Sequence, residues 1–227
     1  MLKPSLYKHI IWDWNGTLLN DAWLFVDIMN DILRSRNMNT ITLEKYREIF
    51  GFPVRKYYRT LGFDIEKESF RKSGLEFINA YKKRRYEAKL YPMANSILAK
   101  LSAKSINHSI LSAQQQDLLD DLTKYYEIQN YFQYIDGLND YYAESKIEEG
   151  LKLIKKTGYN PQNILFIGDT EHDYEVAKAI DADCLLLSHG HNCHKRLIHT
   201  GAPVIRNLED ISHIFAIDVE TKGSDIN

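Results

Sequence analysis

The chain has 227 residues, 44% of them hydrophobic and 26% charged, and its 29 lysines and arginines against 31 aspartates and glutamates give a formal net charge of −2. This composition is typical of a globular protein with a sizeable core, and the balanced charge favours no polyanionic partner such as nucleic acid. No apolar run approaches the roughly 20 residues that a membrane-spanning helix needs. The N-terminus lacks the apolar segment of a signal peptide, and Cys184 and Cys193 lie in dissimilar surroundings that predict no disulfide. We therefore expect a cytoplasmic protein that binds neither nucleic acid nor membranes.

Residues 7–12 form an apolar run with β-branched and aromatic members, which predicts a short buried strand. The run ends at Asp13, and the Asn-Gly-Thr that follows at 15–17 is typical of a turn. From about residue 20 to residue 90 no strand-like alternation is found, and apolar residues recur at helical spacing. Helices are expected over the periodic residues 24–33, after an N-cap at Thr42, near 54–61 and near 66–88. The sequence therefore predicts a helical block inserted directly after the Asp13 turn.

After Tyr91-Pro92 the pattern changes, and short apolar runs alternate with helical segments. Strands are expected at 106–111, 133–136, 163–167 and 183–187, and the helices between and after them at 93–104, 114–124, 144–157, 172–180, 193–200 and 208–216. Continuous apolar strands that alternate with helices are typical of a parallel sheet buried on both faces. The fold class predicted from this pattern is α/β.

Polar side chains follow three of the predicted strands. Asp13 follows the first strand, Ser112 follows the strand at 106–111, and Asp169 comes after the glycine that closes the strand at 163–167. Right-handed crossovers place the carboxyl ends of parallel strands on one edge of the sheet, so we expect these side chains to converge there. Two or three carboxylates with few nearby histidines form a hard oxygen site, which suits Mg²⁺.

The chemistry that such a set supports is phosphoryl transfer. An aspartate such as Asp13 can attack phosphorus and form an aspartyl-phosphate, which divides hydrolysis into two easier steps. Ser112 and the backbone N–H groups beside it, such as that of Ala113, can donate to a phosphoryl oxygen. Lys146, near the start of the helix at 144–157, supplies a positive charge to the incoming phosphate.

The motifs D-x-x-G-T-L at 13–18 and G-D-T-x-x-D at 168–173, together with Ser112 and Lys146, resemble those of haloacid-dehalogenase-superfamily hydrolases. The helical block lies where the phosphoglycolate-phosphatase-like branch carries its α-helical cap, and residues 48–53 resemble a cap segment of that branch. The resemblance implies a Rossmann-like three-layer parallel-sheet core, residues 1–19 and 91–227, with an inserted all-α helical cap domain, residues 20–90.

The resemblance also implies the role of each motif residue. Asp13 would be the nucleophile and a Mg²⁺ ligand, and the backbone carbonyl of Asn15 and the carboxylate of Asp169 would be further ligands. Asp173 would bind the metal or lie beside its ligands. The substrate-binding residues would be Thr17, Ser112, Ala113 and Lys146. The expected activity is that of a Mg²⁺-dependent phosphatase for a small phosphorylated metabolite.

The chain departs from the superfamily at Asn15, where phosphatases carry a second aspartate as general acid and base. A carboxamide cannot exchange a proton near neutral pH, and such a group is typically worth ~10²–10⁴ in rate. Three outcomes follow: a slow phosphatase or one that uses good leaving groups, recruitment of another group such as His172, or a phospho-ligand-binding protein with little turnover. Phosphonoacetaldehyde hydrolases share Trp14 but need a cap lysine, for which Lys56 is poorly spaced. Metal-free haloacid dehalogenases would not need Asp169.

Two further clusters are interpreted without a chemical role. The histidine-rich segment 189–194 follows a strand and has no paired second cluster, so we expect a solvated loop rather than a metal site. The basic run 82–85 lies at the end of a predicted helix, where cations interact favourably with the helix dipole. It is therefore expected to be a helix terminus rather than a nucleic-acid contact.

Overall fold

The computed structural model describes residues 2–64, 70–138 and 146–218. Its core is one parallel sheet with the strand order β5 (Phe132–Leu138), β4 (Asn107–Gln115), β1 (His9–Trp12), β6 (Ile164–Gly168), β7 (Asp183–Leu187) and β8 (Val204–Ile205). The first strand of the chain, β1, lies in the middle of the sheet between β4 and β6. Strand β1 is four residues long, and all four are buried. The predicted α/β fold with a parallel sheet is confirmed.

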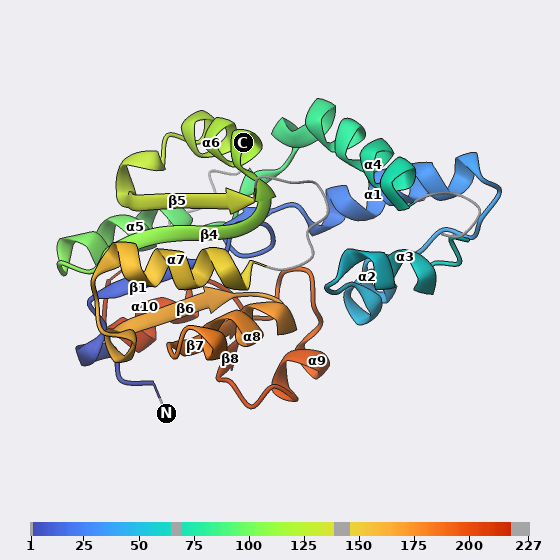
Figure 1. Ribbon diagram of the computed structural model, residues 1–227. Helices are drawn as coiled ribbons and strands as arrows, with labels where there is room; N and C mark the ends of the chain where they lie inside the picture. The colour runs from blue at the N-terminus through green and yellow to red at the C-terminus, as the bar shows by residue number, and fades with distance from the viewer. Residues whose placement is uncertain (1, 65–69, 139–145, 219–227) are drawn as a thin grey trace, which may run out of the picture.

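Helices cover both faces of this sheet. In Figure 1, α7 (Ile147–Thr157) and α8 (Glu171–Ala179) lie in front of it, and α5 (Ala94–Ala103) and α10 (Asp210–Phe215) lie behind it. Successive side chains of a strand point to opposite faces, so Ile11 packs in the cluster with α7 and α8, whereas Ile10 and Trp12 pack in the cluster with α5 and α10. The remaining helices of the core are α6 (Gln116–Tyr125) and α9 (His194–Ile198).

Four further helices gather beyond the edge of the sheet toward which the arrows of β4 and β5 point in Figure 1. They are α1 (Ala22–Ser35), α2 (Leu43–Ile49), α3 (Val54–Thr60) and α4 (Phe70–Arg84). Thr42 is the N-cap of α2, as predicted, because its hydroxyl accepts a hydrogen bond from Lys45 N at 3.1 Å. The predicted start of α4 at residue 66 lies outside the described residues.

A small antiparallel ribbon joins the two ends of this helical block. Strand β2 (Leu19–Asn20) precedes α1 and pairs with β3 (Lys89–Leu90), which follows α4 and the single-turn helix η2 (Arg85–Glu87). The sequence predicted neither strand, because two residues are too few to show an alternating pattern. The division into a core of residues 1–19 and 91–227 and a cap of residues 20–90 stays a prediction.

Other differences from prediction are local. Strand β4 does not end at residue 111: its pairing with β5 shifts register between His108 and Ser109, continues to Leu111, breaks again, and resumes at Gln115. Such an irregularity bends a strand and redirects its side chains. Strand β8 was not predicted, and single 3₁₀ turns occur at η1 (Pro4–Leu6), η3 (Gln129–Tyr131) and η4 (Pro161–Asn163). Among the described residues, no helix has the length and apolar character needed to cross a membrane.

Candidate active site

Asp13 and Lys146 meet at the carboxyl edge of the sheet. Asp13 directly follows β1, and its backbone N–H donates to Ile167 O of β6 at 2.8 Å, which fixes it between two central strands. Lys146 is the residue before α7 and is 2% exposed. Its Nζ forms an ion pair with Asp13 Oδ1 and a second one with Asp173 Oδ1 at 2.8 Å, and it donates to Leu111 O at 3.0 Å. One buried ammonium group therefore holds two carboxylates.

Burial and neighbouring charges shift the pKa values of Asp13 and Lys146. Burial raises the pKa of Asp13, and Lys146 opposes that increase, whereas the carboxylates of Asp173 and Asp169 add to it. Burial alone would lower the pKa of Lys146, but the two carboxylates outweigh it and raise that pKa above its usual value. Lys146 is therefore a fixed positive charge at neutral pH.

Asp169 and Asp173 lie after β6, in the turn that begins α8. Thr170 and Asp173 form a capping box, in which Asp173 Oδ2 accepts from Thr170 N at 2.8 Å and from Thr170 Oγ1 at 2.7 Å. Asp169 N donates to the same oxygen at 3.0 Å. A side chain at Gly168 would overlap the Asp173 carboxyl group, so this position requires glycine. The local sequence thus holds both carboxylates rigidly.

Three buried carboxylates meet here. Oxygens of Asp13, Asp169 and Asp173 all lie within 4.8 Å of one another. Burial and the neighbouring Asp173 raise the pKa of Asp169 to about 6, against the opposing effect of His191. Three acidic groups against one lysine leave an excess of negative charge, and oxygen donors at this spacing suit a hard divalent cation. The donor set therefore fits Mg²⁺.

The other predicted site residues lie around these carboxylates. Ser112 is buried in the irregular part of β4, where its Oγ accepts from Gln114 N at 3.0 Å, and both Ser112 and Ala113 line a cavity that includes Asp13. Thr17 is fully buried, donates to Asp169 Oδ1 at 3.0 Å and does not belong to the described lining of that cavity. Thr17 therefore orients a carboxylate, and its position does not favour contact with a substrate.

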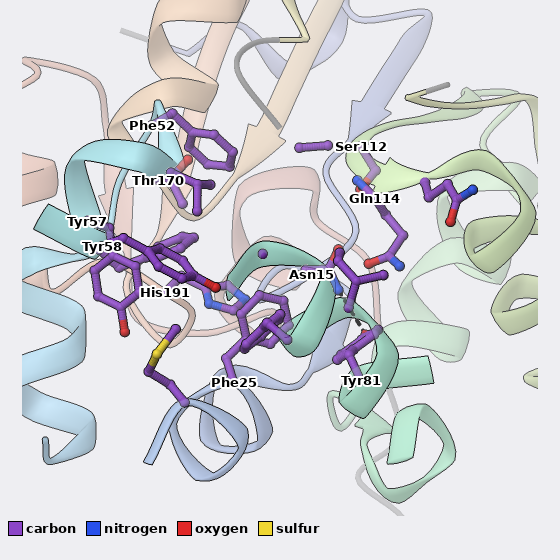
Figure 2. A pocket seen from close by; sticks show the side chains of 18 of the residues that line it. Asn15, Phe25, Phe52, Tyr57, Tyr58, Tyr81, Ser112, Gln114, Thr170 and His191 are labelled. Atoms are coloured by element: carbon purple, nitrogen blue, oxygen red, sulfur yellow. Dashed lines mark hydrogen bonds between the residues drawn. The ribbon is translucent and has the colours of Figure 1, made fainter. Parts of the chain in front are cut away.

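Asn15 turns its side chain toward the helical block. Its Nδ2 donates to Asp21 Oδ2 at 2.6 Å and to the Tyr81 hydroxyl at 3.2 Å, and Figure 2 shows Asn15 above Tyr81 at the wall of the cavity. Gly16, the next residue, has φ +77°, and a side chain there would overlap Asp169 and His191. The turn after Asp13 is thus packed tightly against the carboxylates on one side and against Asp21 on the other.

Two buried residues beside this turn were not predicted from the sequence. Asp21 is fully buried and accepts from Gly16 N at 3.0 Å and from the Tyr81 hydroxyl at 3.1 Å. His191 is 2% exposed, its Nε2 lies 3.2 Å from Asp21 Oδ1, and its Nδ1 lies 2.7 Å from the hydroxyl of Tyr46. Burial alone would lower the pKa of His191, but the hydrogen bond and charge of Asp21 raise it.

The expectation of a solvated loop at 189–194 is therefore wrong for its central residues. His191 and Asn192 are buried, and His191 N donates to Asp169 Oδ2 at 2.5 Å. The loop follows β7 at the same edge of the sheet as Asp13 and Asp169. That position was the available signal, because the rule that singled out the ends of the other strands applies equally to β7.

Two alternatives considered from the sequence, His172 as a replacement acid and Lys56 as a catalytic lysine, are not supported by the positions of these residues. His172 is buried on α8, but its Nε2 accepts from Lys146 N at 3.3 Å and it does not belong to the described lining of the cavity beside Asp13. Lys56 lines a separate cavity, together with His172. The described lining of the cavity beside Asp13 therefore offers neither this histidine as an acid nor Lys56 as an imine-forming amine.

The basic run 82–85 ends α4, as predicted. Arg84 pairs with Asp27 of α1 at 2.7 Å and with Glu87 at 2.7 Å, and Arg85 pairs with Asp121 of α6 at 2.7 Å. These arginines connect helices of this chain to one another.

A parallel sheet with clustered carboxylates and a buried lysine at its carboxyl edge defines a class of α/β hydrolases that act on phosphate esters. Comparison with known proteins is consistent with this class. The sequence model of the haloacid dehalogenase-like hydrolases matches residues 10–187, and the chain belongs to that family.

Similar proteins include phosphatases. Phosphoglycolate phosphatase 1 of Pseudomonas aeruginosa is 26% identical over 216 residues, which cover 91% of this chain and 79% of that protein. A haloacid dehalogenase-like hydrolase of Streptococcus pneumoniae superposes with a TM-score of 0.79 at 20% identity, covering 92% of this chain and 99% of that one. A predicted phosphoglycolate phosphatase of Haemophilus somnus superposes with a TM-score of 0.77 at 18% identity, covering 92% and 98%. At these identities the solved structures show the fold, and the sequence relatives support a phosphatase.

Proposed function

We propose that this protein is a Mg²⁺-dependent phosphatase that hydrolyses a small phosphorylated metabolite through an aspartyl-phosphate on Asp13. The observation that carries the proposal is the cluster of Asp13, Asp169 and Asp173, whose carboxylate oxygens lie within 4.8 Å of one another around buried Lys146. Carboxylates clustered around one lysine at the carboxyl edge of the sheet contribute little to packing. They are costly to bury unless they bind something.

In the first step a carboxylate oxygen of Asp13 attacks phosphorus. The bond from phosphorus to the leaving oxygen breaks, and its electron pair leaves with that oxygen. Lys146 and the hydroxyl of Ser112 stabilise the negative charge of the phosphoryl oxygens, since both line the cavity that contains Asp13. Asn15 has no proton to give, so the leaving oxygen departs as an anion or takes a proton from water.

In the second step water attacks the phosphorus of the aspartyl-phosphate. The bond to the Asp13 oxygen breaks, inorganic phosphate is released and the carboxylate is regenerated. The carboxylates of Asp13 and Asp169 and the backbone carbonyl of Asn15 would hold Mg²⁺, with Asp173 beside them. Bound Mg²⁺ would neutralise the repulsion between these carboxylates and the phosphoryl group.

Asn15 also favours a second candidate, a protein that binds a phosphorylated ligand with little turnover. Both functions use the same carboxylates and lysine. They differ in whether the leaving oxygen departs, and water then attacks the aspartyl-phosphate, without an acid and base at position 15.

Hydrolysis of acetyl phosphate separates the two candidates, because acetate leaves readily without a proton. With Mg²⁺ present, we expect phosphate release that Asp13→Asn abolishes and that Asp31→Asn, on the exposed face of α1, leaves unchanged. Removal of Mg²⁺ with EDTA should stop the reaction, and added Mg²⁺ should restore it. Phosphate release no faster than that of Asp13→Asn would contradict the hydrolase and leave the binding protein, for which calorimetry with inorganic phosphate and Mg²⁺ is the direct measurement.

A further inference from the structure

The cavity beside Asp13 extends from the carboxylates into the helical block. Its volume is about 130 Å³. Asp13, Ser112 and Lys146 lie at one end, and helices α1 to α4 supply most of the remaining wall. Figure 2 shows Phe25, Phe52, Tyr57 and Tyr58 around this space, opposite Ser112. Whatever is attached to the phosphate must therefore occupy the part of the cavity that the helices enclose.

That part of the cavity is built from aromatic side chains. The rings that its wall presents come from all four helices and from the segment between α2 and α3, and they include Phe25, Tyr46, Phe50, Phe52, Phe77 and Tyr81. Several of them pack edge to face, as Phe25 does against Phe77 at a centroid distance of 5.0 Å. Apolar walls of this kind favour an apolar or aromatic ligand.

The same wall offers no free cation to a second acidic group on the substrate. Within the described lining, Lys146 is the only lysine or arginine, and it is already paired with Asp13 and Asp173. His191 is held by Asp21. A small phosphate ester with a carboxylate, such as phosphoglycolate, would bury that charge without a partner, which is unfavourable. Within the described residues, the wall therefore offers no partner for the carboxylate of the compound after which its relatives are named.

The chemistry of Asn15 also favours an aromatic leaving group. Without an acid to protonate it, the leaving oxygen must carry its negative charge away. A phenolic oxygen has a pKa of about 10, whereas an alcohol is as weak an acid as water, with a pKa of about 16. An aryl oxide therefore leaves much more readily than an alkoxide from a site that cannot donate a proton.

Gly74 leaves room for the ring. It lies within α4 and lines the cavity, and a Cβ added there would meet no other atom within 4 Å. Glycine in a helix interior costs roughly 1 kcal/mol relative to alanine. A cavity of roughly 150 Å³ lined by apolar side chains is known to hold one benzene ring. The whole cavity, of which the space beside Gly74 is one part, has a comparable volume of about 130 Å³.

From these observations we infer that the substrate is the phosphate ester of a phenol with a single ring. Its phosphate would lie at Asp13, and its ring would lie between Gly74 and the aromatic side chains of the cavity wall. This inference rests on the proposed phosphatase function and specifies its substrate class. The chemistry is the two-step transfer described above, with the phenolate as leaving group in the first step and water as the second nucleophile.

The buried hydroxyl of Tyr57 favours a substrate whose ring carries a polar substituent. Tyr57 is 3% exposed and lines the cavity, and its hydroxyl has no hydrogen-bond partner among the described residues. Leaving a buried donor unpaired costs about 1–3 kcal/mol, so a polar substituent on the ring would recover that loss.

The test compares four phosphates in the wild-type enzyme with Mg²⁺: phenyl phosphate, cyclohexyl phosphate, phosphoglycolate and acetyl phosphate. We expect kcat/KM for phenyl phosphate to exceed that for phosphoglycolate by on the order of 100-fold. Cyclohexyl phosphate has the shape of the phenyl ester but an alkoxide leaving group, so it should bind with a similar KM and turn over slowly. Preference for phosphoglycolate, or equal rates for all esters, would overturn the inference.

Gly74→Leu tests the position of the ring. It should lower the ratio of kcat/KM for phenyl phosphate to that for acetyl phosphate by on the order of 10- to 100-fold, the value of burying a ring. Asn79→Leu, on the exposed side of the same helix, is the matched control and should leave that ratio unchanged. An unchanged ratio in Gly74→Leu would overturn the placement.

Inhibition by phenylphosphonate, which has no scissile ester bond, measures binding independently of turnover. It should inhibit acetyl phosphate hydrolysis more strongly than methylphosphonate does. If Gly74→Leu does not fold, Gly74→Ala takes its place in the comparison of the two substrates. Equal inhibition by the two phosphonates would contradict a ring site. Acetyl phosphate hydrolysis no faster than that of Asp13→Asn would instead overturn the phosphatase itself.

Discussion

Asn15 Nδ2 donates to Asp21 Oδ2 at 2.6 Å, so the residue that stands two positions after the candidate nucleophile is held by a fully buried carboxylate. The hydroxyl of Tyr81 donates to the same oxygen at 3.1 Å. An amide can donate to Asp21, whereas an ionised carboxylate at position 15 would repel it. The asparagine is therefore matched to its surroundings as well as being a departure from the family pattern.

Asn15→Asp should raise turnover of esters with poor leaving groups. The introduced carboxyl group would lie against Asp21, and two carboxylates at this distance share one proton, which raises the pKa of one of them. A protonated carboxyl at this position can serve as a general acid. We expect kcat for cyclohexyl phosphate to rise by on the order of 100-fold and kcat for acetyl phosphate, whose acetate leaves without an acid, to rise less, measured by phosphate release.

Asn15→Ala is the control for that gain, because it removes the amide without adding an acid. It should not raise turnover of cyclohexyl phosphate. Equal rates in wild type and Asn15→Asp would mean that another group of the wild-type site already supplies the proton.

The sequence was sufficient to predict the α/β fold, and it singled out some of the charged residues that the structure brings together. Alternating apolar runs and helical segments predicted the parallel sheet, and the strand-end rule singled out Asp13 and Asp169, which the structure places with Asp173 and Lys146. Ser112 was assigned to a strand end, but β4 continues to Gln115. A break in pairing of this kind depends on the neighbouring strand and leaves no mark in the local sequence.

Burial of isolated polar residues was not predictable in the same way. Asp21 follows a two-residue strand, and His191 lies among polar loop residues. Side chains of α1, α2 and α4 pack against them: Phe25 and Tyr46 contact His191, and the Tyr81 hydroxyl donates to Asp21. Helical periodicity likewise predicted the helices of this block, but it does not distinguish a closed core from the wall of a cavity.

Asp21→Asn should destabilise the protein. The Asp21 carboxylate accepts from Asn15, Gly16 and the Tyr81 hydroxyl and faces His191, and an amide in its place would turn a donor toward some of these donors. We expect the free energy of unfolding to fall by about 3 kcal/mol in urea denaturation. Asp31→Asn removes an exposed ion pair with Arg34 and should change it by less than about 1 kcal/mol. Equal losses in the two variants would contradict a special role for Asp21.

Lys146→Met should abolish most activity. The ammonium group pairs with Asp13 and Asp173 in a fully buried position, and its loss leaves the phosphoryl group without this positive charge. We expect kcat/KM for acetyl phosphate to fall by on the order of 10²–10³-fold. Lys146→Arg should not restore it, because a planar guanidinium cannot reproduce the contacts that the compact ammonium makes with Asp13, Asp173 and Leu111 O. Recovery of wild-type rates in the arginine variant would show that charge alone suffices.

Three histidines should make the protein unstable in acid. Burial lowers the pKa of His9 to about 4, that of His108 to about 3 and that of His189 to about 4. In the unfolded chain each imidazole titrates near 6.5. Below that pH the unfolded state binds more protons than the folded state does, so the free energy of unfolding falls as the pH falls. The loss for each histidine begins near pH 6.5 and continues until its folded pKa is reached.

His108→Gln isolates one of these contributions. The carboxamide oxygen can still accept from Trp12 Nε1, which donates to His108 Nδ1 at 3.1 Å, but it does not titrate. Between pH 7 and pH 4 the variant should lose roughly 3 kcal/mol less stability than the wild type, because one group contributes about 1.4 kcal/mol per pH unit. His213→Gln removes an exposed histidine of α10 and should leave the pH dependence unchanged. Urea denaturation at pH 7, 5.5 and 4 measures the difference, and parallel curves for His108→Gln and wild type would show that burial of His108 does not drive acid unfolding.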